Sequence, residues 1–169
     1  AAGPGLPPLF TPNPDVVNFA FVVAGTYLDG TQYDALESND FVVLPQNAAQ
    51  AVQAGYDPLH DFHGDGGNDT ITGSVQFNDT IFGDAGDDAI VGLAGADVLS
   101  GGDGLDQLNG GIDDDILNGD AGNDILFGDA GQDVINGGAD DDQLNGEIGD
   151  DTLNGDAGND VINGGIGVD

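Results

Sequence analysis

The sequence predicts an all-β protein in which short parallel strands stack into a β-solenoid with 18 residues per coil. The first observation is a glycine that recurs every nine residues, from Gly83 to Gly164, without exception. The second is an aspartate five positions after each of these glycines, followed two positions later by Ile or Leu while chain remains. The third is the alternation of turn-forming Gly, Asn and Asp with β-forming Ile, Leu and Val. A strict period of this kind is the signature of stacked repeats.

The composition excludes several classes of partner. Of 169 residues, 32 are acidic and none is Lys or Arg, so the formal charge is −32. Without cations to displace the counterions of phosphate, nucleic acid is not expected as a partner, and an anionic membrane surface would repel the chain. No apolar run approaches the roughly 20 residues of a membrane-spanning helix, so we expect no direct membrane insertion. A hydrophobic content of 38% argues against a disordered acidic chain.

The composition changes near residue 63. All seven prolines lie before this point, whereas 26 of the 31 glycines and 25 of the 32 acidic residues lie after it. We therefore expect three parts: a Pro-rich arm over residues 1–15, a strand and helix element over 16–63, and an array of twelve nine-residue units over 64–169.

The N-terminal elements can be predicted in order. Residues 1–15 read as an extended, polyproline-like arm able to lie along another surface. Val16–Ala24 predicts a strand and Thr26–Leu28 a second one. A strand at 41–44 is expected to begin the solenoid, because it follows an Asn-Asp pair as strands do in the array. Residues 47–54 predict a short helix, capped by Asn47 and stopped by Gly55.

The sequence has no recognisable catalytic motif, and we expect no enzyme. It lacks the His-Glu-x-x-His pattern of zinc proteases and the Gly-x-Ser-x-Gly nucleophile elbow. The number of acidic residues alone does not exclude a pair of catalytic carboxylates of the glycosidase type. However, Glu37 and Glu147 lie in no sequence motif that resembles an active-site cleft. His60 and His63 leave a metal or catalytic role open, although an ordinary surface pair is the simpler interpretation.

Each unit of the array combines two kinds of local structure. The first six residues, as in 119–124, are rich in Gly, Asn and Asp and are expected to turn. The last three, as in 125–127, are expected to form a strand with only the middle residue facing inward. Two units then make one coil, and twelve units make six coils around a column of Ile and Leu that runs from Ile71 to Ile162.

The outward residues form two unequal columns. One is apolar and β-branched, and either provides a lateral contact surface or reflects β-propensity alone. Its members are Val98, Ile116, Val134 and Thr152, while the mixed column contains Ala89, Gln107, Ile125, Gln143 and Val161. Asn118, Asn136 and Asn154 lie beside the apolar column and are expected to form an amide ladder.

Stacking creates an electrostatic problem that points to a metal. Carboxylates of successive coils would lie about 4.8 Å apart, where they repel by roughly 1 kcal/mol in bulk water and by several times that near a protein surface. A divalent cation between loops removes this repulsion. Carboxylates and backbone carbonyls are an all-oxygen set that suits Ca²⁺ better than Mg²⁺ or a transition metal. Each loop pairs with the loop two units on, so twelve loops allow up to ten ions.

Two alternative interpretations of the array fit the sequence less well. In a glycine-rich solenoid with merely solvated acids, aspartate would not keep a single phase of the repeat. An ice-binding solenoid needs regular rows of Thr, and Thr is sparse in the array.

The repeat Gly-Gly-x-Gly-x-Asp-x-(Leu/Ile)-x resembles the RTX, or haemolysin-type, calcium-binding nonapeptide over residues 64–169. The resemblance implies a right-handed parallel β-roll in which Ca²⁺ is held by the sixth-position Asp and by carbonyls of the first four positions. The implied carboxylate ligands are Asp69, Asp79, Asp88, Asp97, Asp106, Asp115, Asp124, Asp133, Asp142, Asp151, Asp160 and Asp169. The implied carbonyl ligands include those of Gly83, Gly92, Gly101, Gly110, Gly119, Gly128, Gly137, Gly146, Gly155 and Gly164.

Several units depart from the family pattern. Position four is Asp113 or Asp140 where the pattern has Gly, and position two is Leu93 or Glu147. The unit Gly73–Phe82 is one residue longer and nearly free of glycine. We expect incomplete calcium occupancy around this unit.

Two functions fit these observations. The first is a secreted, extracellular or cell-surface structural protein, whose calcium-rigidified rolls assemble with copies of themselves, head-to-tail or laterally, into a fibre or surface layer. The chain ends at Asp169 with no strand after it, and an open solenoid end invites another copy. The second is a calcium-triggered folding and secretion module of a larger RTX toxin, adhesin or enzyme. Both place the protein outside the cell, where calcium modules work at roughly 10⁻⁴–10⁻³ M; attachment to a cell surface is left open.

Overall fold

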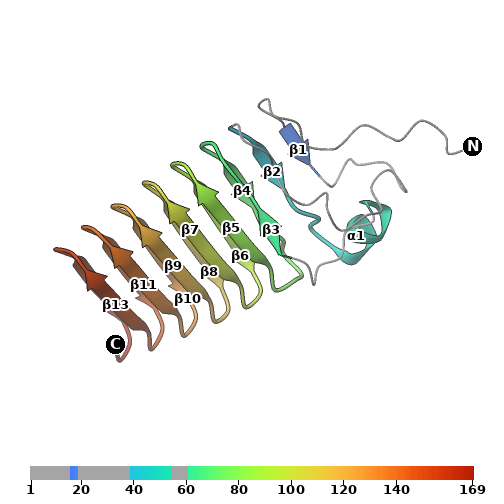
Figure 1. Ribbon diagram of the computed structural model, residues 1–169. Helices are drawn as coiled ribbons and strands as arrows, with labels where there is room; N and C mark the ends of the chain where they lie inside the picture. Colours follow the sequence, from blue (N-terminus) through green and yellow to red (C-terminus); the bar gives the residue numbers. More distant parts are fainter. Residues whose placement is uncertain (1–15, 19–38, 55–60) are drawn as a thin grey trace, which may run out of the picture.

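The computed structural model describes residues 16–18, 39–54 and 61–169, and these residues form one elongated roll (Figure 1). The predictions for the arm 1–15, for the strand 26–28 and for Gly55 and His60 lie outside the described residues, as does most of the strand predicted over 16–24. Two parallel sheets face each other along the roll, and the chain passes from one to the other at every turn.

One sheet has eight strands in the order β1-β2-β4-β6-β8-β10-β12-β14, and the other has six in the order β13-β11-β9-β7-β5-β3. The short strands are β1 (Val16–Asn18), β2 (Phe41–Val43), β3 (Phe62–His63) and β4 (Thr70–Thr72). The regular strands are β5 (Thr80–Ala85), β6 (Ala89–Ala94), β7 (Val98–Asp103), β8 (Gln107–Ile112), β9 (Ile116–Ala121), β10 (Ile125–Ala130), β11 (Val134–Ala139), β12 (Gln143–Ile148), β13 (Thr152–Ala157) and β14 (Val161–Ile166). Each strand therefore pairs with the strand one coil away, which confirms the predicted parallel β-roll with 18 residues per coil.

The inward column is the hydrophobic core, as predicted. Nine of its members are essentially inaccessible to solvent: Ile71, Ile81, Ile90, Leu99, Leu108, Leu117, Leu126, Ile135 and Leu144. Register pairs such as Leu99 with Leu117 place them directly above one another. Leu153 is half-buried and Ile162 is half-exposed, because they lie in the last coils of the roll.

The predicted division of each unit into a six-residue turn and a three-residue strand is wrong. The regular strands are six residues long and run from position seven of one unit through position three of the next, as in β10. Only positions four to six turn the corner. The first-position glycine, for example Gly128, continues the strand and is buried on its inner face. Glycine serves there to leave space rather than to turn the chain, and residue type alone does not separate these two roles.

The N-terminal element joins the same sheets. β2 pairs in parallel with β4, placing Val42 beside Ile71 in the core column, and this confirms the strand predicted over 41–44. β1 covers β2 at the end of the roll (Figure 1). The predicted helix is α1 (Ala48–Ala54), and Asn47 caps it, because its Oδ1 accepts a hydrogen bond from the Gln50 N–H at 3.0 Å.

The predicted outward columns are also confirmed. The register of β7, β9, β11 and β13 aligns the four residues of the apolar column, from Val98 to Thr152. The amide ladder forms beside it. Asn136 Nδ2 donates to Asn118 Oδ1 at 2.9 Å, and Asn154 Nδ2 donates to Asn136 Oδ1 at 2.8 Å.

Candidate metal sites at the corners of the roll

The position-six aspartates line the inside of both corners of the roll. Ten of the twelve, from Asp69 to Asp151, are at most 4% exposed. In the last coil Asp160 is half-buried and Asp169 is exposed. A charged side chain is almost never this buried unless it is paired or bound to a metal. Each of these aspartates before Asp169 immediately precedes a strand, so the strand register carries its side chain to the same place in every coil.

One carboxylate oxygen of every position-six aspartate except Asp79 accepts a backbone hydrogen bond from the preceding coil. The N–H of Asp69 donates to Asp88 Oδ1 at 2.7 Å, and the N–H of Asp97 donates to Asp115 Oδ1 at 2.8 Å. The same bond repeats along both corners, ending at Asp160 and Asp169. The aspartates are therefore linked into two continuous columns, one at each corner.

The second oxygen of these carboxylates has no hydrogen-bond donor. This applies to Oδ2 of Asp69, Asp88, Asp97, Asp106, Asp115, Asp124, Asp133, Asp142 and Asp151, all of which are buried. A buried carboxylate oxygen without a partner is costly, and its regular recurrence needs an explanation. A proton or a cation at this oxygen would remove the cost.

The first-position glycines create space beside this oxygen. A Cβ added at Gly92 would collide with Asp97 Oδ2 and would lie 2.7 Å from the carbonyl oxygen of Gly110 in the next coil. The predicted carbonyl residues from Gly83 to Gly155 are all buried in this way, and Gly164 is half-buried. The structure thus brings the predicted carboxylates and glycine carbonyls together. Such an oxygen-only donor set fits a hard cation such as Ca²⁺.

The side chains alone do not form a metal cluster. Within the described residues, no three His, Cys, Asp or Glu side chains converge as a metal-binding group. A cation at these corners would consequently depend on backbone carbonyls as much as on carboxylates, which agrees with the ligand set that the repeat implies.

The departures from the repeat pattern preserve the backbone at the corners. Position two has a positive φ in every unit except the long one, including Leu93 at 83° and Glu147 at 72°. At position four, Asp113 and Asp140 adopt φ of 81° and 80° where most units have glycine. Aspartate tolerates this left-handed region, whereas leucine and glutamate do so only with strain.

Burial shifts the titration of the aspartate columns in the metal-free protein. It raises the pKa of Asp69, Asp97, Asp106 and Asp115 to about 7, and that of Asp88 and Asp124 to about 6. The hydrogen bond from the preceding coil opposes this rise in pKa, and neighbouring acidic side chains add to it. The columns are therefore poised to bind protons or cations near neutral pH.

The long unit at 73–82 differs from the others. The N–H of Ser74 donates to Asp79 Oδ2 at 2.6 Å, so this oxygen already has a donor, and it is Oδ1 of Asp79 that is buried without a partner. Ser74 is fully buried, and its Oγ accepts the N–H of Phe77 at 2.9 Å. Ser74 is also the one position-two residue from 65 to 165 without a positive φ. The extra residue thus remodels the loop and gives a structural reason to expect weaker metal binding there.

Asp40 is a further member of the columns that the predicted ligand set missed. It is 3% exposed, and its N–H donates to Asp69 Oδ1 at 2.6 Å, as in the regular units. Asn39 Oδ1 accepts the N–H of Asn68 at 3.1 Å, which is also a repeat contact. The Asn-Asp pair before an apolar strand was the signal in the sequence, but the unit lies outside the nine-residue register.

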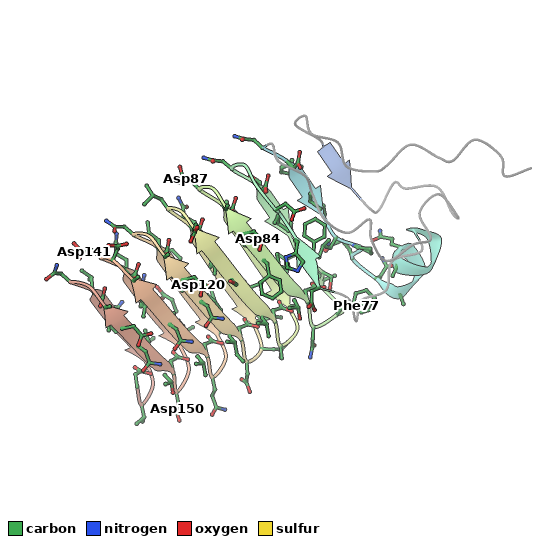
Figure 2. All side chains as sticks on the ribbon, in the orientation of Figure 1. Phe77, Asp84, Asp87, Asp120, Asp141 and Asp150 are labelled. Atoms are coloured by element: carbon green, nitrogen blue, oxygen red, sulfur yellow. The ribbon has the colours of Figure 1, made fainter. Side chains whose placement is uncertain are left out.

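Side chains at position five form an outer rim on each corner. Asp87 Oδ1 accepts the N–H of Leu105 at 3.1 Å, and Asp141 Oδ1 accepts that of Asn159 at 2.8 Å. Figure 2 shows Asp87 and Asp141 along one corner and Asp150 at the other. These exposed carboxylates bond to the backbone of adjacent coils and contribute negative potential around the inner columns.

His63 lies on an outer sheet face rather than in a corner. Its ring stacks on Phe82, with centroids 4.6 Å apart, and its Nδ1 lies 2.8 Å from Asp84 Oδ2. His63 thus contacts an aromatic ring and a carboxylate within the sheet, while the predicted pairing of His60 with His63 lies outside the described residues.

The fold and the corner chemistry define a class: a parallel β-roll whose buried carboxylates and carbonyls are arranged to hold hard cations. The model of the RTX calcium-binding nonapeptide repeat matches residues 63–99, 74–108, 100–135, 109–144 and 136–169. The chain therefore belongs to the RTX calcium-binding repeat family, as the sequence resemblance predicted. Comparison with curated proteins and with solved structures found no match.

Family membership makes this chain a calcium-binding structural module, of a kind that is generally not catalytic. Within the described residues, no helix combines the length and hydrophobicity required to cross a bilayer.

Proposed function

We propose that the roll is a calcium-dependent structural protein that acts outside the cell and associates laterally with copies of itself. The observation that carries the calcium part is the unpartnered Oδ2 of nine buried aspartates in two columns. Successive aspartates of each column, from Asp69 to Asp160 and from Asp79 to Asp169, together with position-one to position-four carbonyls, would hold about ten ions between coils.

Calcium would supply charge neutralisation and bonds between coils. The chain's own residues fix the geometry: Oδ1 is occupied by the preceding coil, while Oδ2 remains directed at the space beside the first-position glycine. Ten divalent ions would reduce the formal charge of −32 to about −12. An extracellular location follows from this requirement, because calcium sites of extracellular modules fill at roughly 10⁻⁴–10⁻³ M. RTX repeats also occur in secreted proteins.

Lateral association is supported by an apolar row, here called the Ile/Ala row, that runs along the C-terminal ends of the strands of the larger sheet. Its members are Ala94, Ile112, Ala130, Ile148 and Ile166, which the strand register aligns. The three isoleucines are more than half exposed. From Ala94 to Ile148 large and small side chains alternate, so a second copy shifted by one coil would place isoleucines beside alanines. Bound calcium would reduce the repulsion between copies.

Electron microscopy and sedimentation in calcium and in EGTA test this proposal. We expect lateral bundles only with calcium, and their loss in the double variant Ile112→Asp, Ile148→Asp. Leu105→Asp is the matched control, because Leu105 is equally exposed but lies outside the row. A monodisperse, calcium-loaded monomer would contradict self-assembly and favour the alternative, a calcium-triggered folding module of a larger secreted protein.

A further inference from the structure

The first corner of the roll is built differently from the regular ones. Leu44 continues β2 into position one: its N–H donates to Thr72 O at 2.8 Å, just as the Gly73 N–H donates to Val91 O at 2.7 Å one coil later. Every regular unit has glycine at this position. Leu44 is fully buried, so its side chain occupies the inner face of the corner that glycine leaves open elsewhere.

The Gln46 side chain bridges two successive coils at this corner. Its Nε2 donates to Leu44 O at 2.8 Å and to Gly73 O at 2.6 Å. These are the position-one carbonyl oxygens of adjacent coils. In the regular corners, position-one carbonyls belong to the oxygen set that fits a cation. Here the side-chain amide of Gln46 already donates a hydrogen bond to each of the two carbonyl oxygens.

Neighbouring groups hold Gln46 in this position. The Gln46 N–H donates to Gln50 Oε1 at 2.7 Å, which ties the residue to α1. The Ala48 N–H donates to Gln76 Oε1 at 3.1 Å, which ties α1 to the long loop of the next coil. The same loop supplies the Ser74 N–H that satisfies Asp79 Oδ2. The longer loop of this unit therefore contributes to the contacts that hold Gln46 at the first corner.

We infer that the Gln46 amide takes the place of an ion at this corner, so that the coil of residues 39–54 docks on the next coil there without calcium. The inference rests on the proposed calcium function, since it assigns one corner as the boundary of the metal array. Leu44 fills the space, the Gln46 amide donates to both carbonyls, and the Ser74 N–H donates to Oδ2 of the nearest carboxylate, Asp79, whose Oδ1 stays buried without a partner. The array at this corner then begins between Asp79 and Asp97, with no ion between Asp79 and the coil of residues 39–54.

Gln46→Glu tests the inference directly, because it replaces the bridging donor with a carboxylate facing two carbonyl oxygens. Hydrogen exchange of peptides covering 39–54 is measured in saturating calcium, with bound calcium counted by equilibrium dialysis. We expect exchange at least about ten-fold faster than in the wild-type chain, with no added ion. Gln46→Met removes the donor without adding charge and is expected to accelerate exchange less. Gln143→Glu, on an exposed sheet face, is the matched control and should change neither measurement.

Unchanged protection of 39–54 in Gln46→Glu without an added ion would overturn the inference, because the corner would then need neither a donor nor a cation. An additional ion with 39–54 still protected would support it, because the ion would then occupy the place of the amide. If the wild-type chain bound no calcium, both the proposed function and this inference would be wrong. Ions bound normally, with no effect of either Gln46 variant, would remove the inference alone.

Discussion

The regular coils from Gly83 onward and the first coil of residues 39–54 share one backbone ladder but have different corners. In both, each strand pairs in parallel with the strand one coil away, and an apolar residue of each strand enters the same core column. The regular corners contain glycine and a carboxylate oxygen without a donor. The first corner contains leucine and an amide with two acceptors. The ladder and the core therefore do not decide whether a coil depends on metal; the contents of the corner do.

Calcium removal is expected to have the largest effect, and it tests whether the regular coils depend on bound metal. In EGTA at pH 7.5 the regular coils lose the cations that offset like charge in the aspartate columns, and we expect most of the sheet signal in circular dichroism to disappear. Calcium in excess should restore it, whereas Mg²⁺ at the same concentration should not. A sheet signal that survived EGTA, with no calcium uptake in calorimetry, would contradict the metal-dependent array.

Protonation of the buried aspartates should partly substitute for bound calcium. Burial raises the pKa of these aspartates above the ordinary value, so their contribution to metal-free stability is complete below about pH 4 and is lost as the pH rises through about 6 to 7. We expect the chain in EGTA to regain sheet signal between pH 8 and pH 5. Substituting Asp106 and Asp124 with Asn should flatten this dependence, and a metal-free signal that grew with increasing pH would contradict it.

Single carboxylates should distinguish the two kinds of corner. Asp115→Asn removes charge at a regular corner and is expected to lower apparent calcium affinity roughly ten-fold, or about 1.4 kcal/mol. Asp79→Asn should have a clearly smaller effect, because an amide oxygen there still accepts the Ser74 N–H. Calorimetric calcium titration of both variants measures the difference. Equal losses of affinity would show that the long loop binds calcium like the others.

Backbone strain in the regular array can be relieved. Leu93 is held at a φ of 83°, so Leu93→Gly should stabilise the calcium-loaded roll by about 1 kcal/mol in denaturant unfolding. Gln107→Gly, at an exposed strand position, is the control and should destabilise it slightly. Destabilisation by Leu93→Gly would mean that the contacts of the leucine side chain outweigh the strain.

The amide ladder should give the smallest effect. Asn136 donates to one neighbour and accepts from another on a part-exposed face, so Asn136→Ala is expected to cost about 0.5–1 kcal/mol. Asn145→Ala, at the equivalent position of β12 but outside the ladder, should cost less. Thermal unfolding in saturating calcium compares the two variants, and equal costs would remove the ladder as a source of stability.

Much of the fold could be predicted because the repeat is strict. The inward column, the two outward columns and the amide ladder follow from the phase of each residue in an 18-residue coil. The helix at 48–54 follows from its Asn47 cap. The turn was predicted too long, because glycine at position one and glycine at position four look alike in sequence. Only the structure shows that the first leaves space beside a carboxylate and that the second permits a left-handed corner.

By itself, the sequence determined the coil, the core column and the identity of the aspartates, since all of these depend on spacing along the chain. The tertiary structure decided which oxygen of each carboxylate is satisfied, and it placed Gln46 beside Gly73 and Ser74 beside Asp79. It also brought Asp40 into the column of Asp69. These two residues are 29 positions apart, a separation that does not fit the nine-residue period. The physical reason is that burial and hydrogen bonding between coils depend on what lies one turn away in space.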